Sequence, residues 1–276
     1  MATRDAYCFI NDLDASTIEG LIARLEFRGK DPTFTHMRDA YLAQLALPPS
    51  AHILELGCGT GVVLRALAKH TGFSGHLVGV DQSPVLIAAA RRLAAEEGLD
   101  QHIEFLVGDV HHLDVAESSF DAVIAHTLLS HVADPVLVLK EAARVVRPGG
   151  SVAIFDGDFA SLVFAHPDPA FAKAMEEALG EAVFAHPRLM RDLPRLLQQV
   201  GLGITATRAY IYAEIGTGSF FAGFAETYAP LVQRASLMTA RQVEDWLLEQ
   251  RRAREQHTFF AACNFYAYLT RRPVGQ

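Results

Sequence analysis

A glycine-rich segment around residue 57 has the residue types of a ligand site. It reads Ile53-Leu54-Glu55-Leu56-Gly57-Cys58-Gly59-Thr60-Gly61. An apolar strand that carries an acid near its end and turns through glycines into a helix is typical of a nucleotide or nucleoside site. The reason is that glycines let a ligand approach the backbone, and the first N–H groups of the helix are unpaired. The GxGxG spacing differs from the GxGxxG of dinucleotide sites, and the Gly-Lys-Ser/Thr ending of a phosphate-binding loop is absent. The segment therefore favours a nucleoside ligand and disfavours a dehydrogenase.

Two more strand patterns end in an acid. Asp81 closes an apolar run 20 residues after Gly61, where a carboxylate can accept hydrogen bonds from both hydroxyls of a ribose. Asp109 follows the next apolar run. Its carboxylate can accept a hydrogen bond from the exocyclic amine of an adenine while Val110 packs on the ring. The alternatives are a helix cap for Asp81, because Ser83 is near, and a plain turn for Asp109.

Five motifs in order make the middle of the chain resemble a known family. The motifs ELGCGTG, GVDQS, VGDV, FDAVIAHTLLSHV and RVVRPGG lie within residues 50–157. This region resembles the class I S-adenosylmethionine-dependent methyltransferases. It is most similar to the small-molecule branch that includes the ubiquinone and menaquinone C-methyltransferases. The resemblance implies S-adenosylmethionine as the cofactor.

The resemblance also implies a role for each motif position. The glycine segment would hold the methionine part of the cofactor, Asp81 its ribose, and residues 109–110 its adenine. His126 falls where the family has a cofactor contact after its fourth strand, and the alternative for it is a structural histidine. The implied cofactor-binding residues are Glu55, Gly57, Cys58, Gly59, Thr60, Gly61, Asp81, Gln82, Ser83, Asp109, Val110 and His126.

A base is needed in methyl transfer only if the nucleophile carries a proton with a high pKa. His131, in the segment after the fourth predicted strand, is the catalytic candidate, because imidazole titrates near pH 6.5 and accepts a proton when neutral. Asp156 and Asp158 are alternatives after the fifth strand, and His131 can also line its loop without chemistry. None of the twelve histidines has metal-ligand spacing, so we expect no metal.

Aromatic residues gather outside the core and indicate the acceptor side. Of the 25 aromatic residues, 12 lie between Tyr210 and Tyr268. Such a lid suggests a flat or hydrophobic acceptor, and ordinary core packing is the alternative. Arg28 and Arg38 are candidates to pair with the cofactor carboxylate, or are solvated. The substrate-binding candidates are Phe34, Tyr41, His131, Asp156, Phe220 and Phe224.

The elements that must position these residues alternate along the middle of the chain. Apolar runs at 51–56, 76–80, 103–107, 122–125 and 151–155 predict strands, and stretches at 61–70, 84–97 and 135–146 predict helices. Strands flanked by helices imply a parallel sheet covered on both faces, hence a doubly wound α/β fold. The resemblance implies seven strands in a mostly parallel sheet, the Rossmann-like methyltransferase fold, with an antiparallel last strand.

The flanking regions are mostly helical. We expect one domain over 1–276, with an N-terminal helical cap at 1–49, the cofactor-binding core at 50–157, a strand and helical substrate-lid insertions at 158–256, and a final strand at 257–270. The alternation of strands and helices stops after Asp156, and strand patterns return at 203–215 and 259–269. Helical patterns begin near Asp168 and His186 and fill 217–232 and 240–254.

Composition narrows the class of protein. A net charge of −8 repels phosphate backbones, so we expect no nucleic-acid partner. Cys8, Cys58 and Cys263 lie far apart, which suits a reducing compartment. The first residues show no targeting signal, and no apolar run approaches the roughly 20 residues of a membrane helix. We expect a cytoplasmic protein without a membrane partner, as a monomer or homodimer.

Together these patterns predict methyl transfer from S-adenosylmethionine to an oxygen, nitrogen or carbon nucleophile of a small, aromatic or hydrophobic molecule. One alternative is a protein of the same fold that binds the cofactor without transferring methyl, as a cyclisation catalyst or binding module. Another alternative is a methyltransferase that acts on protein or RNA.

Overall fold

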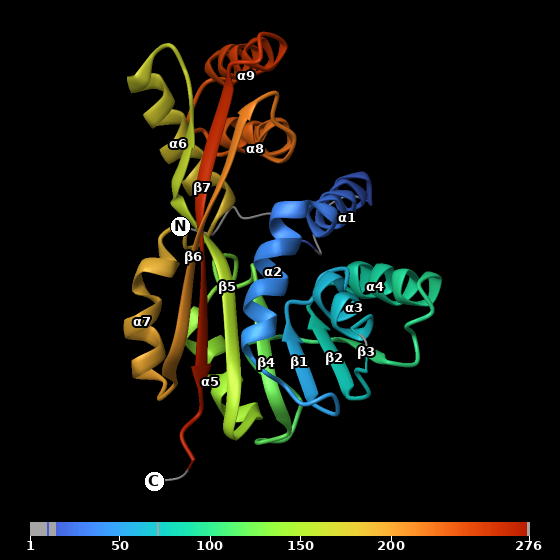
Figure 1. Ribbon diagram of the computed structural model, residues 1–276. Helices are drawn as coiled ribbons and strands as arrows, with labels where there is room; N and C mark the ends of the chain where they lie inside the picture. The colour runs from blue at the N-terminus through green and yellow to red at the C-terminus, as the bar shows by residue number, and fades with distance from the viewer. Residues whose placement is uncertain (1–9, 11–14, 71, 275–276) are drawn as a thin grey trace.

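Seven strands of the described chain form one sheet. A computed structural model describes residues 10, 15–70 and 72–274; Cys8 and most of the N-terminal segment examined for a targeting signal lie outside them. The strand order is β3-β2-β1-β4-β5-β7-β6 (Figure 1). β1 to β5 pair in parallel, and β7 runs antiparallel between β5 and β6. The predicted mostly parallel sheet with an antiparallel last strand is confirmed. The strands are β1 (His52–Leu56), β2 (His76–Asp81), β3 (Ile103–Val107), β4 (Phe120–His126), β5 (Val146–Phe164), β6 (Gly203–Gly216) and β7 (Phe259–Arg271).

Helices flank the sheet, and four of those in the described chain begin where the sequence has a cap followed by proline. Asp31, Ser83, Asp134 and Asp168 each accept a backbone N–H from the first turn of α2, α4, α5 and α6. These acceptors satisfy donors that the first helical turn leaves unpaired. The helices are α1 (Ala15–Lys30), α2 (Pro32–Gln44), α3 (Val62–Ala68), α4 (Pro84–Glu96), α5 (Pro135–Val145), α6 (Pro169–Val183), α7 (Leu189–Gln199), α8 (Phe220–Arg234) and α9 (Ala240–Glu255).

The core has one apolar cluster on each face of the sheet. Along β1, Ile53 belongs to the cluster that includes Met37 of α2 and Leu64 of α3. Its neighbour Leu54 belongs to the opposite cluster, with Val138 of α5. Alternate residues of a strand point to opposite faces, so an uninterrupted apolar run places β1 between two layers of helices. This burial fixes the end of β1, and with it the glycine segment.

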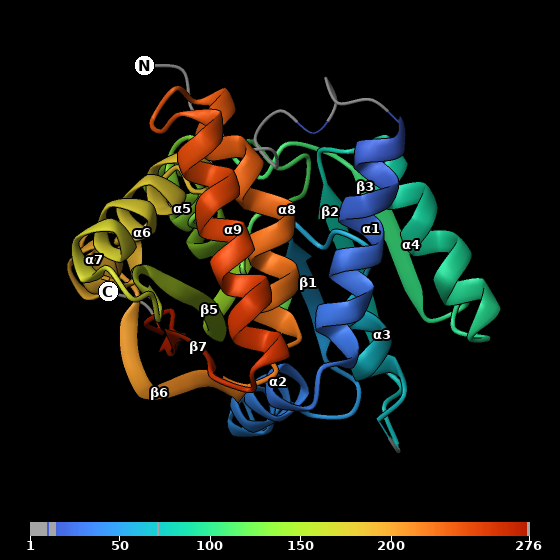
Figure 2. The same cartoon turned by 90° about the horizontal axis from the view of Figure 1, so that it is seen from above.

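The predicted fifth strand, 151–155, is too short. β5 continues to Phe164, because its second half pairs with β7 from Asp158 opposite Asn264 to Phe164 opposite Ala261, with a register shift between. The long strands β5, β6 and β7 extend past the other strands and carry α6, α8 and α9 (Figure 1). Seen from above, α8 and α1 lie over the same end of the sheet (Figure 2). This end is the carboxyl edge of the parallel strands.

Candidate functional site

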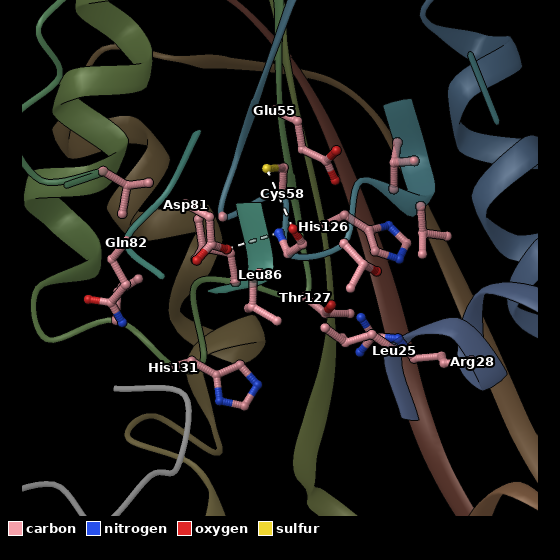
Figure 3. Close-up of a pocket in the computed structure, with 18 of the residues that line it drawn as sticks. Leu25, Arg28, Glu55, Cys58, Asp81, Gln82, Leu86, His126, Thr127 and His131 are labelled. Carbon is pink, nitrogen blue, oxygen red and sulfur yellow. Dashed lines mark hydrogen bonds between the residues drawn. The ribbon is translucent and has the colours of Figure 1, made fainter. Parts of the chain in front are cut away.

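A pocket, here called the glycine-loop pocket, lies at the carboxyl ends of β1, β2 and β4 (Figure 3). Open α/β sheets bind ligands at this edge. Most of the predicted cofactor-binding residues line it: Glu55, Gly57, Cys58, Gly59, Thr60, Asp81, Gln82, Asp109, Val110 and His126. His131 and Phe34 line it as well. The structure thus brings together candidate residues that are up to 103 positions apart, from Arg28 to His131.

Backbone geometry explains the glycines of the loop. Gly57 has φ +61°, and a Cβ added there would meet Leu128 Cδ1 at 2.3 Å. Gly61 has φ +77° where α3 begins, and its Cβ would meet the Phe105 ring at 2.6 Å. L side chains rarely adopt this left-handed region. Gly57 therefore keeps the pocket wall close to the backbone, whereas Gly61 is not on the wall and serves the strand-to-helix turn.

Glu55 is a buried acid on the pocket wall. Its Oε2 has no hydrogen-bond partner among the described residues. Burial raises the pKa of this carboxyl well above its usual range, while a hydrogen bond from the Leu64 backbone N–H and the charges of Arg28 and Arg38 act in the opposite direction. Both arginines also line the pocket. A buried carboxylate oxygen without a hydrogen-bond partner carries a desolvation cost that a cationic or N–H donor ligand relieves.

Asp81 both lines the pocket and holds its loop. Its carboxylate accepts the backbone N–H groups of Gly59 and Ser83, each at 2.9 Å. Burial raises the pKa of Asp81, and these two bonds oppose the shift. The Ser83 hydroxyl accepts the Leu86 N–H at 3.3 Å at the start of α4 and lies off the pocket wall. The predicted cofactor contact of Ser83 is therefore not supported, because its side chain is fully buried as a helix cap.

The Asp109 carboxylate is fixed by its own turn. It accepts the His111 backbone N–H at 2.9 Å and contacts the His111 ring Nδ1 at 2.6 Å. These bonds lower the pKa of Asp109 against a desolvation that would raise it. Asp109 and Val110 line the pocket together with His111. Asp109 is thus a turn residue and a wall residue at once.

His126 is a buried neutral histidine held by Tyr41. The Tyr41 hydroxyl and His126 Nδ1 are 2.9 Å apart. Burial lowers the pKa of His126 well below its usual range and raises that of the Tyr41 phenol. Tyr41 also stacks on Phe155 and is fully buried away from the pocket. The predicted substrate contact of Tyr41 is not supported, because its ring packs in the core behind His126.

Asp156 supports the loop that carries His131. It is fully buried and accepts the N–H groups of Ser130 at 3.1 Å and Gly157 at 2.8 Å. It lies outside both of the pockets that His131 lines. A direct substrate contact of Asp156 is therefore not supported. Asp158, the other alternative, is paired with Arg191 through Oδ2 at 2.8 Å.

A second pocket, here called the aromatic pocket, adjoins the first. The two share Leu25, Arg28, Phe34 and His131. The Arg24 guanidinium stacks over the rings of Phe220, Phe224 and Tyr228 at 4.9, 5.4 and 4.9 Å. The walls also include residues that the sequence did not single out: Arg24, Leu25, Phe159, Leu162, Phe184 and Phe265. Phe220 and Phe224 face this pocket, as their aromatic neighbourhood in the sequence suggested.

The cap helix α1 is tied to the glycine loop. Glu26 accepts the Thr60 hydroxyl at 2.7 Å and pairs with Arg65 of α3 at 2.6 Å. Arg65 is buried and also pairs with Glu97. A buried arginine between two acids is held in a fixed geometry by its forked donors. This network, the Glu26–Arg65–Glu97 bridge, places Leu25 and Arg28 over the pocket.

Residues 48–202, more than half of the chain, match a family model described as a methyltransferase domain. The chain belongs to this family. The chain is 32% identical over 180 residues to the demethylmenaquinone methyltransferase of Bacillus velezensis, which covers 60% of this chain and 76% of that protein. It is 34% identical over 167 residues to an uncharacterised protein of transposon Tn4556 from Streptomyces fradiae, which covers 60% of this chain and 48% of that protein. It thus spans about half the length of this second relative. The resemblance seen in the motifs is confirmed.

Solved structures share the fold of the methyltransferase. The YcgJ protein of Bacillus subtilis superposes with a TM-score of 0.61 at 15% identity, over 87% of this chain and 100% of that one. The 4+2 cyclase SpnF superposes with a TM-score of 0.57 at 20% identity, over 90% of this chain and 85% of that one. In the described part of the methyltransferase, no group of three or more His, Cys, Asp or Glu side chains gathers as a metal site, and no helix is long and apolar enough to cross a membrane.

Proposed function

We propose that this methyltransferase moves the methyl group of S-adenosylmethionine to a small molecule. The observation that carries the proposal is the pair of buried carboxylates, Glu55 and Asp81, at a glycine loop whose pocket adjoins an aromatic one. The cofactor has an ammonium group, a ribose diol and an adenine. The wall has a carboxylate oxygen without a partner in Glu55, a carboxylate at the next strand end and an apolar edge at Val110.

The residues present fit the parts of this cofactor. Glu55 and the glycine loop, with Cys58 and Thr60, would hold the methionine part. Asp81 would accept the ribose hydroxyls, and Gln82 would lie beside the adenine. Asp109, Val110 and His126 complete the wall. When bound, the cofactor supplies an electrophilic methyl group on a sulfonium. Gly61 and Ser83 contribute indirectly, through the turn and the helix start that they fix.

The aromatic pocket would receive the acceptor. Its phenylalanine rings favour a flat or hydrophobic molecule, and His131 lies where the two pockets meet. The rate of methyl transfer gains most from holding both reactants close and aligned and from excluding water. His131 would take the proton of an oxygen or nitrogen nucleophile. Asp156 would act as a positioning residue for the His131 loop.

Two alternatives remain open to experiment. The 4+2 cyclase SpnF has the same fold, so the fold does not separate a methyltransferase from a cyclisation catalyst or binding module. The net charge of −8 disfavours an RNA acceptor. A small-molecule acceptor, the cytoplasm as the place of action, and the absence of a nucleic-acid or membrane partner stay predictions.

Calorimetric titration with S-adenosylmethionine and S-adenosylhomocysteine tests the cofactor site. We expect micromolar binding of both and a loss with Glu55→Gln, while the exposed Glu104→Gln on β3 serves as a matched control. A radioactive methyl donor incubated with a panel of phenols, quinols and aromatic amines then tests transfer. Binding without transfer to any acceptor class would favour the alternative that does not transfer methyl, and absence of binding would overturn the cofactor assignment.

A further inference from the structure

The strand β6 is an open edge of the sheet. Among the described residues it pairs only with β7, so the backbone groups along its other side have no partner strand. The side chains of Ile211 and Ile215 are 75% and 79% exposed. A long edge strand with exposed apolar residues is a template for pairing with another strand.

Exposed apolar residues continue from this edge across one face of the sheet. Ile215 lies opposite Phe260 of β7, and Ile211 lies opposite Asn264. Val163 of β5 lies opposite Ala262, which has the same parity on β7 as Phe260 and therefore the same face. Phe260 and Val163 are both exposed. Neighbouring strands thus add apolar surface beside the open edge.

We propose that two copies of the chain pair antiparallel through β6, with Ile211 on the two-fold axis. When two identical edges pair about a two-fold axis, residues that lie directly opposite each other must point to the same face of the continuous sheet. This is possible only if one residue of each copy lies on the axis. The register shift between Ile204 and Ala206 limits regular pairing to Ala206–Gly216, and Ile211 is the middle residue of that stretch. The two-fold symmetry thus requires a residue on the axis, and the register shift makes Ile211 the middle of the stretch that can pair.

Charge supports the same register. With Ile211 opposite itself, Arg208 lies opposite Glu214 of the other copy, and this pair occurs twice. No other choice of axis residue places Arg208 directly opposite Glu214. Cross-strand pairs of opposite charge stabilise a sheet. Glu214 is held in place because it accepts the Ser219 and Phe221 backbone N–H groups, at 2.8 and 2.7 Å. The exposed Arg208 is then the partner that moves to meet it.

The interface would lie behind the aromatic pocket. Tyr212 of β6 is buried, stacks on Phe220 at 5.4 Å and donates a hydrogen bond to Asp31 at 2.7 Å. Asp31 caps α2. Pairing through β6 would therefore stabilise the wall that carries Phe220. The pairing does not depend on which acceptor binds in the aromatic pocket.

Sedimentation equilibrium of the full chain over a wide concentration range tests the association. We expect a dimer that Ile211→Lys converts to a monomer with unchanged circular dichroism, because two ammonium groups would meet at the axis. Val274→Lys, at another exposed apolar position, is the matched control and should stay dimeric. A monomeric natural chain, or a dimer that Ile211→Lys leaves intact, would overturn the proposal.

Disulfide trapping tests the register in a Cys8→Ser background, since Cys58 and Cys263 are buried. Opposed residues of antiparallel strands have Cα atoms about 4.5–5.5 Å apart, within reach of a disulfide. Ile211→Cys should cross-link to itself. Ala213→Cys should cross-link only when mixed with Ala209→Cys. Self-linking of Ala213→Cys, or no link in any of these, would overturn the register.

Discussion

The carboxylate of Asp81, at the end of β2, accepts the backbone N–H of Gly59, at 2.9 Å, in the loop that follows β1. The two strands are neighbours in the sheet, with Leu56 opposite Val80, so the acid reaches the loop of the adjacent strand directly. The loop is therefore held in a ligand-receiving shape by a residue that also lies on the pocket wall.

Asp81→Ala should weaken S-adenosylmethionine binding more than tenfold by calorimetry. The substitution removes both the acceptor for the ribose and the bond that holds Gly59. Ser83→Ala is the matched control, because it removes only the cap of α4; it should cost about 1 kcal/mol of stability and leave affinity nearly unchanged. A loss below tenfold for Asp81→Ala would reduce its role to that of a cap.

Gly57→Ala should abolish cofactor binding. The new Cβ would lie 2.3 Å from Leu128 Cδ1 at a φ of +61°. Gly98→Ala is the control, since Gly98 has φ +70° and nothing within 4 Å of a Cβ. Both variants should lose about 1–2 kcal/mol from left-handed strain in thermal unfolding, and only the first should lose binding. Retained affinity in Gly57→Ala would contradict the assigned loop.

Glu55→Gln should raise the melting temperature of the ligand-free protein at pH 8 and not at pH 4. Burial raises the pKa of Glu55 in the folded state above its unfolded value. A raised folded pKa means that the folded state binds more protons, so the stability contribution is present below the unfolded pKa and is lost as pH rises through the folded one. The glutamine side chain does not ionise, so the Glu55→Gln variant does not lose folding stability in this way. Equal melting temperatures at pH 8 would indicate that Glu55 has a partner in solution.

His131→Ala should lower turnover while cofactor affinity stays nearly constant, once an acceptor with a protonated nucleophile is identified. General-base catalysis contributes typically 10²–10⁴-fold, so a loss in about that range is expected. His102→Ala, at an exposed side chain away from both pockets, is the control. Unchanged turnover at saturating acceptor would remove His131 from the mechanism, and loss of cofactor binding would make it a wall residue only.

The sequence was most informative about positions that depend on residues close by in the chain. Glu55, Asp81 and Asp109 sit at or near successive strand ends, and parallel strands bring those ends to one edge whatever the rest of the chain does. Apolar runs located most strands, and proline-linked caps located the starts of α2, α4, α5 and α6, for the same reason. These features depend on a few neighbouring residues.

The sequence was least informative where a distant partner decides. Tyr41 lies in the core, 2.9 Å from His126, which is 85 positions away. Asp156 is buried where it accepts the N–H of Ser130, 26 positions away. β5 continues because β7 pairs with it about a hundred residues later. No local pattern around Tyr41, Asp156 or residue 160 reports these partners.

Because of the Glu26–Arg65–Glu97 bridge, the segment that forms the glycine-loop pocket is longer than the segment that matches the family model. The family match begins at residue 48, yet Leu25, Arg28, Phe34 and Arg38 form one wall of the glycine-loop pocket. A fragment cut at the family boundary would leave Thr60 and Arg65 without Glu26 and would open the pocket on that side. Relatives that align only over the matched segment therefore give no information on the seven described residues, from Ile10 to Arg38, that line this pocket ahead of it.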